Sequence, residues 1–401
     1  MILFVLKGLC LPLLGSLWSS SGLCFDVSSL YLSGLSLVLG FSLVFWQSCF
    51  SGVGLFMIYL SLCCSIFSYC CAHSLGFRVF YEGAILPLLF LLVRESPYSE
   101  RYVASWYLLG YVVLTSLPML LCLFYLSVEA GSFNLCHWEG VSASGFAVVL
   151  LLSVLFITKV PLPPFHVWLP IVHAEASSPV SVCLSGYVMK LGLLGVYRFC
   201  SWLLPSHIFS VVYLSVGMVL ALLSSFFSAS RELDGKRWLA FMSLAHILVP
   251  AVFLVWSGFN GLGLFIMYCV GHGVSAGVEG LFLWLAYEVS GSRNWAVLNL
   301  SLSGGLWGGF EGARPLYCSF FATHVASNWE VHTLWEAGPV AVSLVLGLFS
   351  YLFWGGLIPI FVWSGSLTRH NSVSSRSGYA FSGLSSMLFL LLWSFILFLV
   401  G

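Results

Sequence analysis

Residues 158–199 read TKVPLPPFHVWLPIVHAEASSPVSVCLSGYVMKLGLLGVYRF and lie among almost uninterrupted apolar segments. The stretch contains the ionisable residues Lys159, His166, His173, Glu175 and Lys190. An ionisable residue at the centre of a bilayer costs about 2.5–3.5 kcal/mol on insertion scales, so such residues are rare without a use. The pattern indicates an ion or proton path through a membrane. The alternative is a set of satisfied salt bridges in a membrane scaffold.

Three prolines, Pro161, Pro163 and Pro164, interrupt the helix predicted at the start of this stretch. Prolines free backbone carbonyls, which membranes tolerate only inside protein or beside a water-filled cavity. We therefore expect a broken helix at this point, with polar groups close to the break.

The composition of the whole chain indicates whether it is a soluble or a membrane protein. Of 401 residues, 60% are hydrophobic and 7% are charged, and the mean hydropathy is +1.04. Soluble globular domains carry about 25% charged residues, and a soluble core of this size cannot hide so much apolar surface. The sequence therefore predicts a polytopic helical membrane protein. Its 14 basic and 14 acidic residues give a formal net charge of zero, which argues against a nucleic-acid partner.

Cofactor motifs are missing from the sequence. The 13 cysteines include no C-x-x-C spacing. This argues against an iron–sulfur cluster or a zinc site bound by cysteines. No G-x-G-x-x-G opens a helix after a strand, as dinucleotide binding would require. We expect no cofactor and no metal in this chain.

Apolar windows of about 20 residues predict about thirteen membrane crossings. The sixth crossing begins near residue 144 and breaks at Pro161, and the eleventh is interrupted at residues 309–315. Residues 2–18 lack a clear signal cleavage site and are expected to be a retained helix. The other crossings are predicted near residues 29–47, 51–71, 74–94, 103–127, 178–200, 206–229, 238–256, 259–288, 296–335, 338–363 and 380–399.

Loop charge supports this count. With thirteen crossings, the loops after the fourth, eighth, tenth and twelfth face one side of the membrane and hold nearly all loop lysines and arginines, as the positive-inside rule expects. These residues are Arg94, Arg101, Arg231, Lys236, Arg237, Arg293, Arg369 and Arg376.

The two broken segments lie five crossings apart. Because five is odd, a five-helix repeat would be inverted in the membrane, and interrupted helices at corresponding places in inverted halves point to a transport site. We therefore expect an all-α polytopic membrane protein with two inverted five-helix repeats, each with a broken helix. The predicted division is 1–48 (shortened N-terminal helices), 49–203 (first half), 204–365 (second half) and 366–401 (loop and last helix). The eleventh segment can also be read as a loop between two short crossings.

Motifs within these segments resemble a known family. The run KVPLPPFHVWLPIVHAEASSPVSV, followed by VMKLGLLGVYR, resembles the antiporter-like membrane subunits of respiratory complex I, which carry K-x-P-x-x-x-x-H-x-W-L-P-x-A-H-x-E-A before L-K-L-G-x-x-G. Three further stretches favour the mitochondrial branch of that family. They are YEGAILP at 81–87, SERYVASWYLLGYVVLTSLPMLL at 99–121 and RELDGKRWLAFMSLAHI at 231–247.

The sequence departs from the family pattern in several places. Only about 80 residues precede Glu82, so one N-terminal helix is expected to be missing. Ser177 occupies the position of a family proline, and Val172 that of an alanine. The motif L-P-P-x-x-N-x-x-G-E is reduced to FATHVASNWE at 321–330. Glu330 is therefore the first choice for its glutamate, with Glu336 and Glu311 as alternatives.

Glu82 and Lys159 lie on neighbouring predicted crossings and are expected to form an ion pair. A carboxylate close to a lysine favours the protonated amine, whereas separation in a dry site favours the neutral amine. Making or breaking the pair would therefore take up or release a proton. A static pair is the alternative, although buried pairs add little net stability.

The resemblance implies roles for the remaining ionisable residues. Lys190 would be the central relay, and His166 and His173 would pass protons with water, since imidazole titrates nearest neutral pH. The path would continue through His246 and His272 to a gate at Glu330. A histidine satisfied within the core is the alternative for each imidazole. Asp234 and Lys236 are expected in a solvated turn.

The resemblance also implies a function. The chain would translocate protons across the mitochondrial inner membrane, driven by NADH–ubiquinone electron transfer through flavin and iron–sulfur clusters in other subunits. Its partners would be other membrane-arm subunits of complex I, including neighbouring antiporter-like subunits, and membrane lipids. Two alternatives remain open: an Mrp-type cation/proton antiporter subunit, and a scaffold that only seals the membrane arm.

Overall fold

The computed structural model of the chain describes somewhat more than half of its residues. These are residues 18–19, 22–44, 51–140, 146–160, 165–200, 224–225, 228–229, 231–257, 262–294 and 297. The predicted crossings near 338–363 and 380–399, and most of those near 2–18, 206–229 and 296–335, lie outside them. The number of crossings, the second broken helix and the fourfold division of the chain therefore stay predictions.

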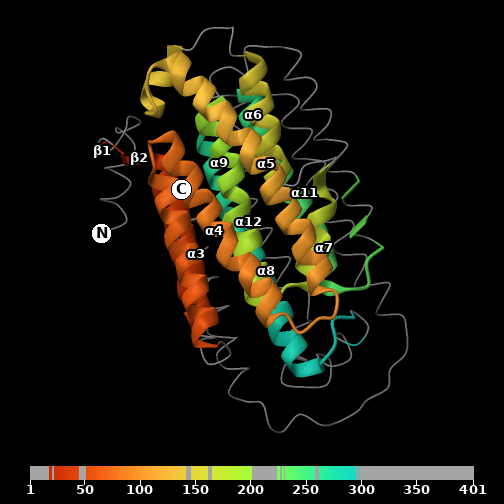
Figure 1. Cartoon of the computed structure of the whole chain (residues 1–401). Coiled ribbons are helices and arrows are strands. Elements are labelled where there is room, and N and C mark those ends of the chain that lie inside the picture. The colour runs from red at the N-terminus through yellow and green to blue at the C-terminus, as the bar shows by residue number, and fades with distance from the viewer. Residues whose placement is uncertain are drawn as a thin grey trace, which may run out of the picture.

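Long helices lying side by side make up the described part of the chain (Figure 1). A helix satisfies its own backbone hydrogen bonds, as an apolar membrane segment must. The α-helices are α2 (Val27–Val44), α3 (Gly52–Cys70), α4 (Ser74–Glu95), α5 (Arg101–Ala130), α6 (Phe146–Lys159), α7 (Trp168–Glu175), α8 (Ser178–Cys183), α9 (Met189–Cys200), α11 (Gly235–Ser257) and α12 (Leu262–Ser290). Two 3-10 helices, η2 (Leu135–Gly140) and η4 (Phe165–Val167), and one π-helical turn, η5 (Leu184–Val188), complete the helical elements described.

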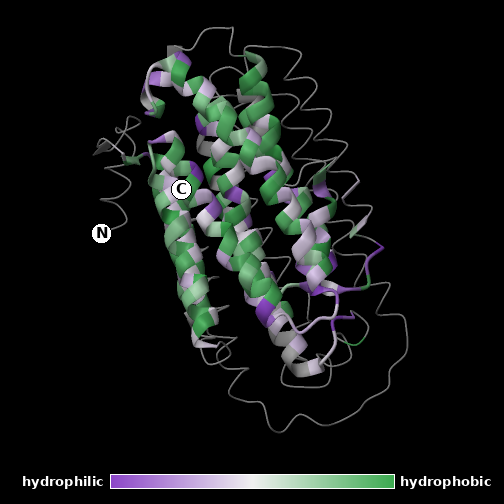
Figure 2. Ribbon diagram, viewed as in Figure 1, coloured by the Kyte–Doolittle hydropathy of each residue, from purple (hydrophilic) through white to green (hydrophobic). Residues whose placement is uncertain are grey.

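Hydrophobic residues cover most of each helix, and hydrophilic ones are found in the loops and at isolated points along the helices (Figure 2). Within the described residues, four helical runs are long and apolar enough to cross a membrane: Gly52–Cys70, Ser74–Glu95, Arg101–Ala130 and Ser178–Cys200. The structure thus agrees with a multi-pass helical membrane protein.

The run Ser178–Cys200, made of α8, η5 and α9, is the most enclosed of these four. Protein buries 94% of its most apolar window, against 33% for α5. A lysine in this run is therefore surrounded by protein and not by lipid. By contrast, α5 presents large apolar side chains outward, such as Trp106 at 72% exposure and Leu114 at 76%.

Local signals set the ends of several helices. The Oγ of Ser51 accepts a hydrogen bond from the Gly54 amide and caps α3, and Nδ1 of His73 does the same for α4 through the Gly76 amide. Helix α5 ends at Gly131, whose φ of 67° lies in the left-handed region that glycine adopts without strain.

A small strand pair departs from the expected all-α fold. Strand β1 (Trp18–Ser19) pairs antiparallel with β2 (Cys24–Phe25), directly before α2. Single bridges also join Leu23 to Cys71 and Asp234 to Asn294. These short pairings satisfy backbone groups in the connections and do not alter the helical class.

Candidate functional site

Helix α6 ends at Lys159, where the sequence predicts a break, and helical structure is described again from η4 and α7 onward. Residues 161–164, which contain the three prolines, lie outside the described part. Nε1 of Trp168, in α7, donates a hydrogen bond to the carbonyl oxygen of Thr158 over 3.3 Å. The end of α6 and the start of α7 are therefore tied together beside Lys159.

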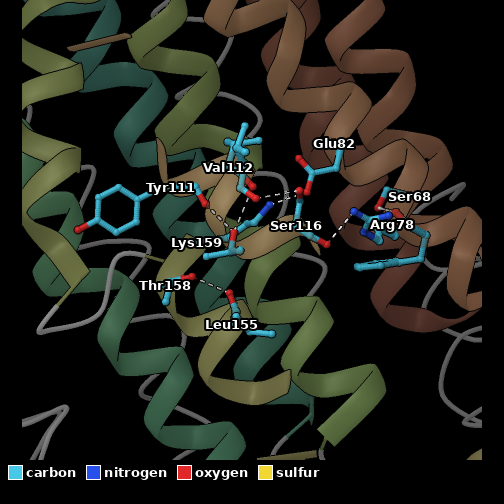
Figure 3. A network of polar contacts seen from close by, with 12 residues as sticks. Ser68, Arg78, Glu82, Tyr111, Val112, Ser116, Leu155, Thr158 and Lys159 are labelled. Atoms are coloured by element: carbon cyan, nitrogen blue, oxygen red, sulfur yellow. Dashed lines mark hydrogen bonds and ion pairs between the residues drawn. The ribbon is translucent and has the colours of Figure 1, made fainter. Parts of the chain in front are cut away.

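The expected ion pair joins α6 to α4. Nζ of Lys159 lies 2.6 Å from Oε1 of Glu82, with side-chain exposures of 4% and 16% (Figure 3). A charge-assisted hydrogen bond of this length is a strong one. The ammonium also lies 4.8 Å from the ring centroid of Tyr81, where the face of the ring attracts a cation.

Lys190 is completely buried in α9, and its ammonium has two neighbours. It donates to the carbonyl oxygen of Ser185 and lies 2.8 Å from Nδ1 of His272 on α12. While Lys190 is protonated its amine can only donate, so His272 then accepts at Nδ1 and, as a neutral imidazole, carries its proton on Nε2. No carboxylate in the described part of the chain forms an ion pair with Lys190.

A π-helical turn sets the position of Lys190. In η5 the amide of Met189 donates to the carbonyl of Leu184, five residues back. Such turns occur often at functional sites, since they insert one extra residue into a helix. The extra residue allows the carbonyl of Ser185 to accept from the Lys190 side chain.

The two histidines of α11 and α12 lie next to each other. The ring centroids of His246 and His272 are 6.3 Å apart, and both side chains are buried. The planes of the two rings are tilted by 35° to each other. Glu279, two helical turns after His272 on α12, is also buried, at 4% exposure.

Two further predicted site residues, His173 and His166, form no hydrogen bond or ion pair with these groups within the part of the chain that the structure describes. His173 is 1% exposed, and neither of its ring nitrogens has a hydrogen-bond partner among the residues described. His166 is half-buried in η4, and nothing in the described ranges forms a hydrogen bond or ion pair with its ring. Glu330, with its alternatives Glu336 and Glu311, lies outside the described residues.

The expectation of a solvated turn at Lys236 is wrong. Lys236 is 6% exposed, and its Nζ donates to the carbonyl of Ala176 over 3.0 Å. Ser96 Oγ donates to the carbonyl of Glu175, and Arg293 donates to that of Ala174. The last carbonyls of a helix have no partner within it. Lys236 is buried because it caps the end of α7, to which cations are also attracted by the helix dipole.

Tyr98, in the loop between α4 and α5, completes this cap. The ring centroid of Tyr98 lies 4.0 Å from Cζ of Arg293 and 5.0 Å from Nζ of Lys236. Burial raises the pKa of the Tyr98 phenol above its ordinary value, so the hydroxyl stays neutral at any physiological pH. Asp234 is less buried than Lys236 and pairs with Arg293 at 3.5 Å.

One charged residue of the fourth crossing escaped the sequence analysis. Arg78 lies four residues before Glu82 on α4, and its Nη2 donates to the carbonyl of Ser116 on α5 over 2.7 Å. Residues four apart share a helix face, so this spacing was a signal that could have drawn attention to Arg78. The family motif around Glu82 begins after it.

No metal site is apparent in the part of the chain that the structure describes, since no three His, Cys, Asp or Glu side chains gather there. Four of the buried or partly buried ionisable side chains form two contacts between helices, Glu82 with Lys159 and Lys190 with His272.

The sequence profile of the family described as "NADH:quinone oxidoreductase/Mrp antiporter, TM" matches residues 72–329. The chain belongs to this family. The matched segment contains Glu82, Lys159, Lys190 and both histidines of the α11–α12 pair, and the resemblance drawn from the sequence is thereby confirmed.

The relatives compared with this chain share the name NADH-ubiquinone oxidoreductase chain 4. The chain is 28% identical over 351 residues to NADH-ubiquinone oxidoreductase chain 4 of Ceratitis capitata, covering 86% of this chain and 71% of that protein. It is 31% identical over 254 residues to chain 4 of Locusta migratoria, covering 60% and 55%. Against several of these relatives the matched segment spans only about half of their length, for example 49% in Chlamydomonas reinhardtii.

Solved structures show the same fold. A chain of respiratory complex I from Thermus thermophilus superposes with a TM-score of 0.76 at 19% identity, over 98% of this chain and 93% of that one. A chain of the Mrp complex from Dietzia sp. DQ12-45-1b gives 0.72 at 18% identity, over 94% and 76%. The chain therefore shares the fold of these two membrane subunits.

Proposed function

We propose that this chain is a core membrane subunit of respiratory complex I, NADH:ubiquinone oxidoreductase, and that it moves protons across the mitochondrial inner membrane. One observation carries the proposal. Within the fold of this family, the buried Glu82–Lys159 pair and the Lys190–His272 contact join ionisable side chains on four helices. Electron transfer would take place on flavin and iron–sulfur clusters of other subunits. The partners would be other membrane-arm subunits, neighbouring antiporter-like subunits among them, and membrane lipids.

The Glu82–Lys159 ion pair controls whether Lys159 keeps its proton. While Oε1 of Glu82 contacts Nζ of Lys159, the lysine holds its proton. When the carboxylate moves away, the buried ammonium loses its compensating charge and releases a proton. Lys190 takes up this proton after passing its own to Nδ1 of His272.

The imidazoles carry the proton onward. Protonation of His272 at Nδ1 allows release of the proton from Nε2, through water, towards His246. His173 and His166 are proposed to hold waters that connect Lys159 to Lys190, and the unpartnered ring nitrogens of His173 fit that role. Glu330 is proposed as the gate at the far end, in the second of two inverted repeats within a thirteen-helix chain.

An Mrp-type cation/proton antiporter subunit is the second candidate. The observation that favours it is the shared fold with a chain of a solved Mrp complex. The names of the curated relatives favour complex I.

Purification through a tag on this chain tests the proposal. We expect flavin and iron–sulfur subunits to co-purify, and the isolated complex to oxidise NADH with ubiquinone and to acidify liposomes. The variant Glu82→Gln should assemble normally but pump about tenfold less, as expected when a proton carrier is removed. Sodium/proton exchange without NADH oxidation would favour the Mrp candidate. Normal pumping by Glu82→Gln would refute the relay.

A further inference from the structure

Arg78 lies on the same face of α4 as Glu82, one helical turn closer to the start of the helix. In Figure 3, Lys159 and Arg78 lie on opposite sides of Ser116, and Glu82 lies beside them. Arg78 Nη2 donates to the carbonyl of Ser116 over 2.7 Å. Its Nε is enclosed and has no hydrogen-bond partner among the described residues. The guanidinium can therefore donate at least one further hydrogen bond.

The relay itself creates a need for a second cation. Lys159 releases its proton only when Glu82 moves away, yet removing one partner of a buried pair leaves an uncompensated charge and is strongly unfavourable. A carboxylate at this depth therefore needs another partner during that step. In the structure the carboxylate contacts Lys159, and no ion pair joins it to Arg78.

We propose that Arg78 is the alternate partner of Glu82: the carboxylate moves between Lys159 and the guanidinium of Arg78, which holds it while Lys159 is neutral. The inference rests on the proposed function and names a positioning residue for it. Side chains four residues apart on a helix come within contact distance by a change of rotamer. Arginine suits the role because its positive charge compensates the carboxylate while Lys159 is neutral.

The position of Arg78 also determines the direction in which the Glu82 carboxylate would move. Leaving Lys159 for Arg78 takes the carboxylate towards the start of α4, the end opposite to the Arg94 loop. Proton release from Lys159 is thereby linked to a displacement of negative charge along the membrane normal.

Three variants of the assembled complex test this inference, with the proton-to-NADH ratio in liposomes as the measurement. Arg78→Gln keeps hydrogen-bond donors but removes the charge, and should lower the ratio several-fold. Arg78→Lys keeps a charge and should restore most of it. Arg94→Gln, at the exposed other end of α4, is the matched control and should pump normally.

A double variant tests whether Arg78 affects pumping through Glu82. If Arg78 acts through Glu82, Arg78→Gln should lower the ratio no further when Glu82→Gln is already present. An unchanged ratio in Arg78→Gln, or no rescue by Arg78→Lys, would overturn the inference. If Arg78→Gln does not assemble, Arg78→Lys decides: a near-normal ratio supports the inference, and lost pumping in an assembled complex overturns it.

The two proposals fail in different ways. Loss of pumping in Glu82→Gln together with normal pumping in Arg78→Gln removes only the role of Arg78. Normal pumping in Glu82→Gln removes the relay itself, and the role of Arg78 with it.

Discussion

Nζ of Lys190 lies 2.8 Å from Nδ1 of His272, although 82 positions separate the two residues in the chain. An ammonium and an imidazole share a hydrogen bond only while the imidazole is neutral at the accepting nitrogen. The contact therefore shows a lysine next to a group that can take its proton. It also joins α9 to α12, and in the proposed relay it would lead the proton away from the ion pair.

Replacing His272 by leucine should remove the acceptor for the Lys190 proton. Because positioned acid–base groups contribute about 10²-fold or more to proton transfer, we expect coupled pumping to fall by at least a factor of ten. The measurement is the proton-to-NADH ratio of purified complex in liposomes. His137→Leu, an exposed histidine in η2, is the control and should pump normally. Equal ratios in both variants would exclude His272 from the relay.

Lys159→Arg should keep the ion pair with Glu82 but impair pumping. A guanidinium stays protonated under all relevant conditions and cannot release a proton when the carboxylate leaves. The complex should assemble to normal levels, as judged by NADH oxidation with an artificial electron acceptor. A wild-type proton-to-electron ratio in the assembled variant would leave the static ion pair as the better interpretation.

Gly273→Ala should disturb the contact between α12 and η5. A β-carbon at position 273 would lie 2.5 Å from Cδ2 of Leu35 and 3.1 Å from the carbonyl oxygen of Gly186. Overpacking of this kind costs about 1–3 kcal/mol, and either the Leu35 side chain or the helix next to His272 must shift. We expect a lower thermal midpoint and weaker pumping.

The control for this substitution is Gly110→Ala in α5, where an added β-carbon meets nothing within 4 Å. Alanine is the better helix former, by about 1 kcal/mol in a helix interior. That variant should be at least as stable as the original chain. A lower midpoint in the control than in Gly273→Ala would contradict the packing argument.

Lys236→Met should destabilise the end of α7. It removes the donor to the buried carbonyl of Ala176, and an unsatisfied buried group costs about 1–3 kcal/mol. The thermal midpoint of the detergent-solubilised complex should fall. Arg237→Met, on the exposed neighbouring residue, is the matched control and should leave the midpoint almost unchanged. Equal midpoints would show that Lys236 does not stabilise the cap.

Local patterns were sufficient to predict the helices and the first ion pair. Long apolar windows predict α3, α4 and α5 closely, and the proline cluster predicts the break after Lys159. Because Glu82 and Lys159 lie on neighbouring crossings, and membrane charges need partners, their pairing follows from the sequence. The residues of the relay were named from a family motif, and their roles stay predictions.

Contacts between distant helices could not be predicted in this way. Lys236 was placed in a solvated turn because its neighbours in sequence are charged, whereas its partner is the end of α7, 60 residues earlier. The contact of Lys190 with His272 depends on how α9 and α12 pack, which no local pattern contains. Arg78 was not predicted as a site residue because the family motif around Glu82 begins after it.

The π-helical turn at Leu184–Val188 has a consequence for how this region tolerates change. Each residue of an α-helix advances the chain by about 100° around the axis. A π-helical turn absorbs one extra residue locally, so the helical segments on its two sides keep their register. Deleting one residue from the turn should restore ordinary winding while Lys190 keeps facing α12, whereas deleting one residue from α8 should rotate Lys190 by about 100° away from His272. A single lost codon should therefore abolish coupling when it falls in α8 and weaken it less when it falls in the turn.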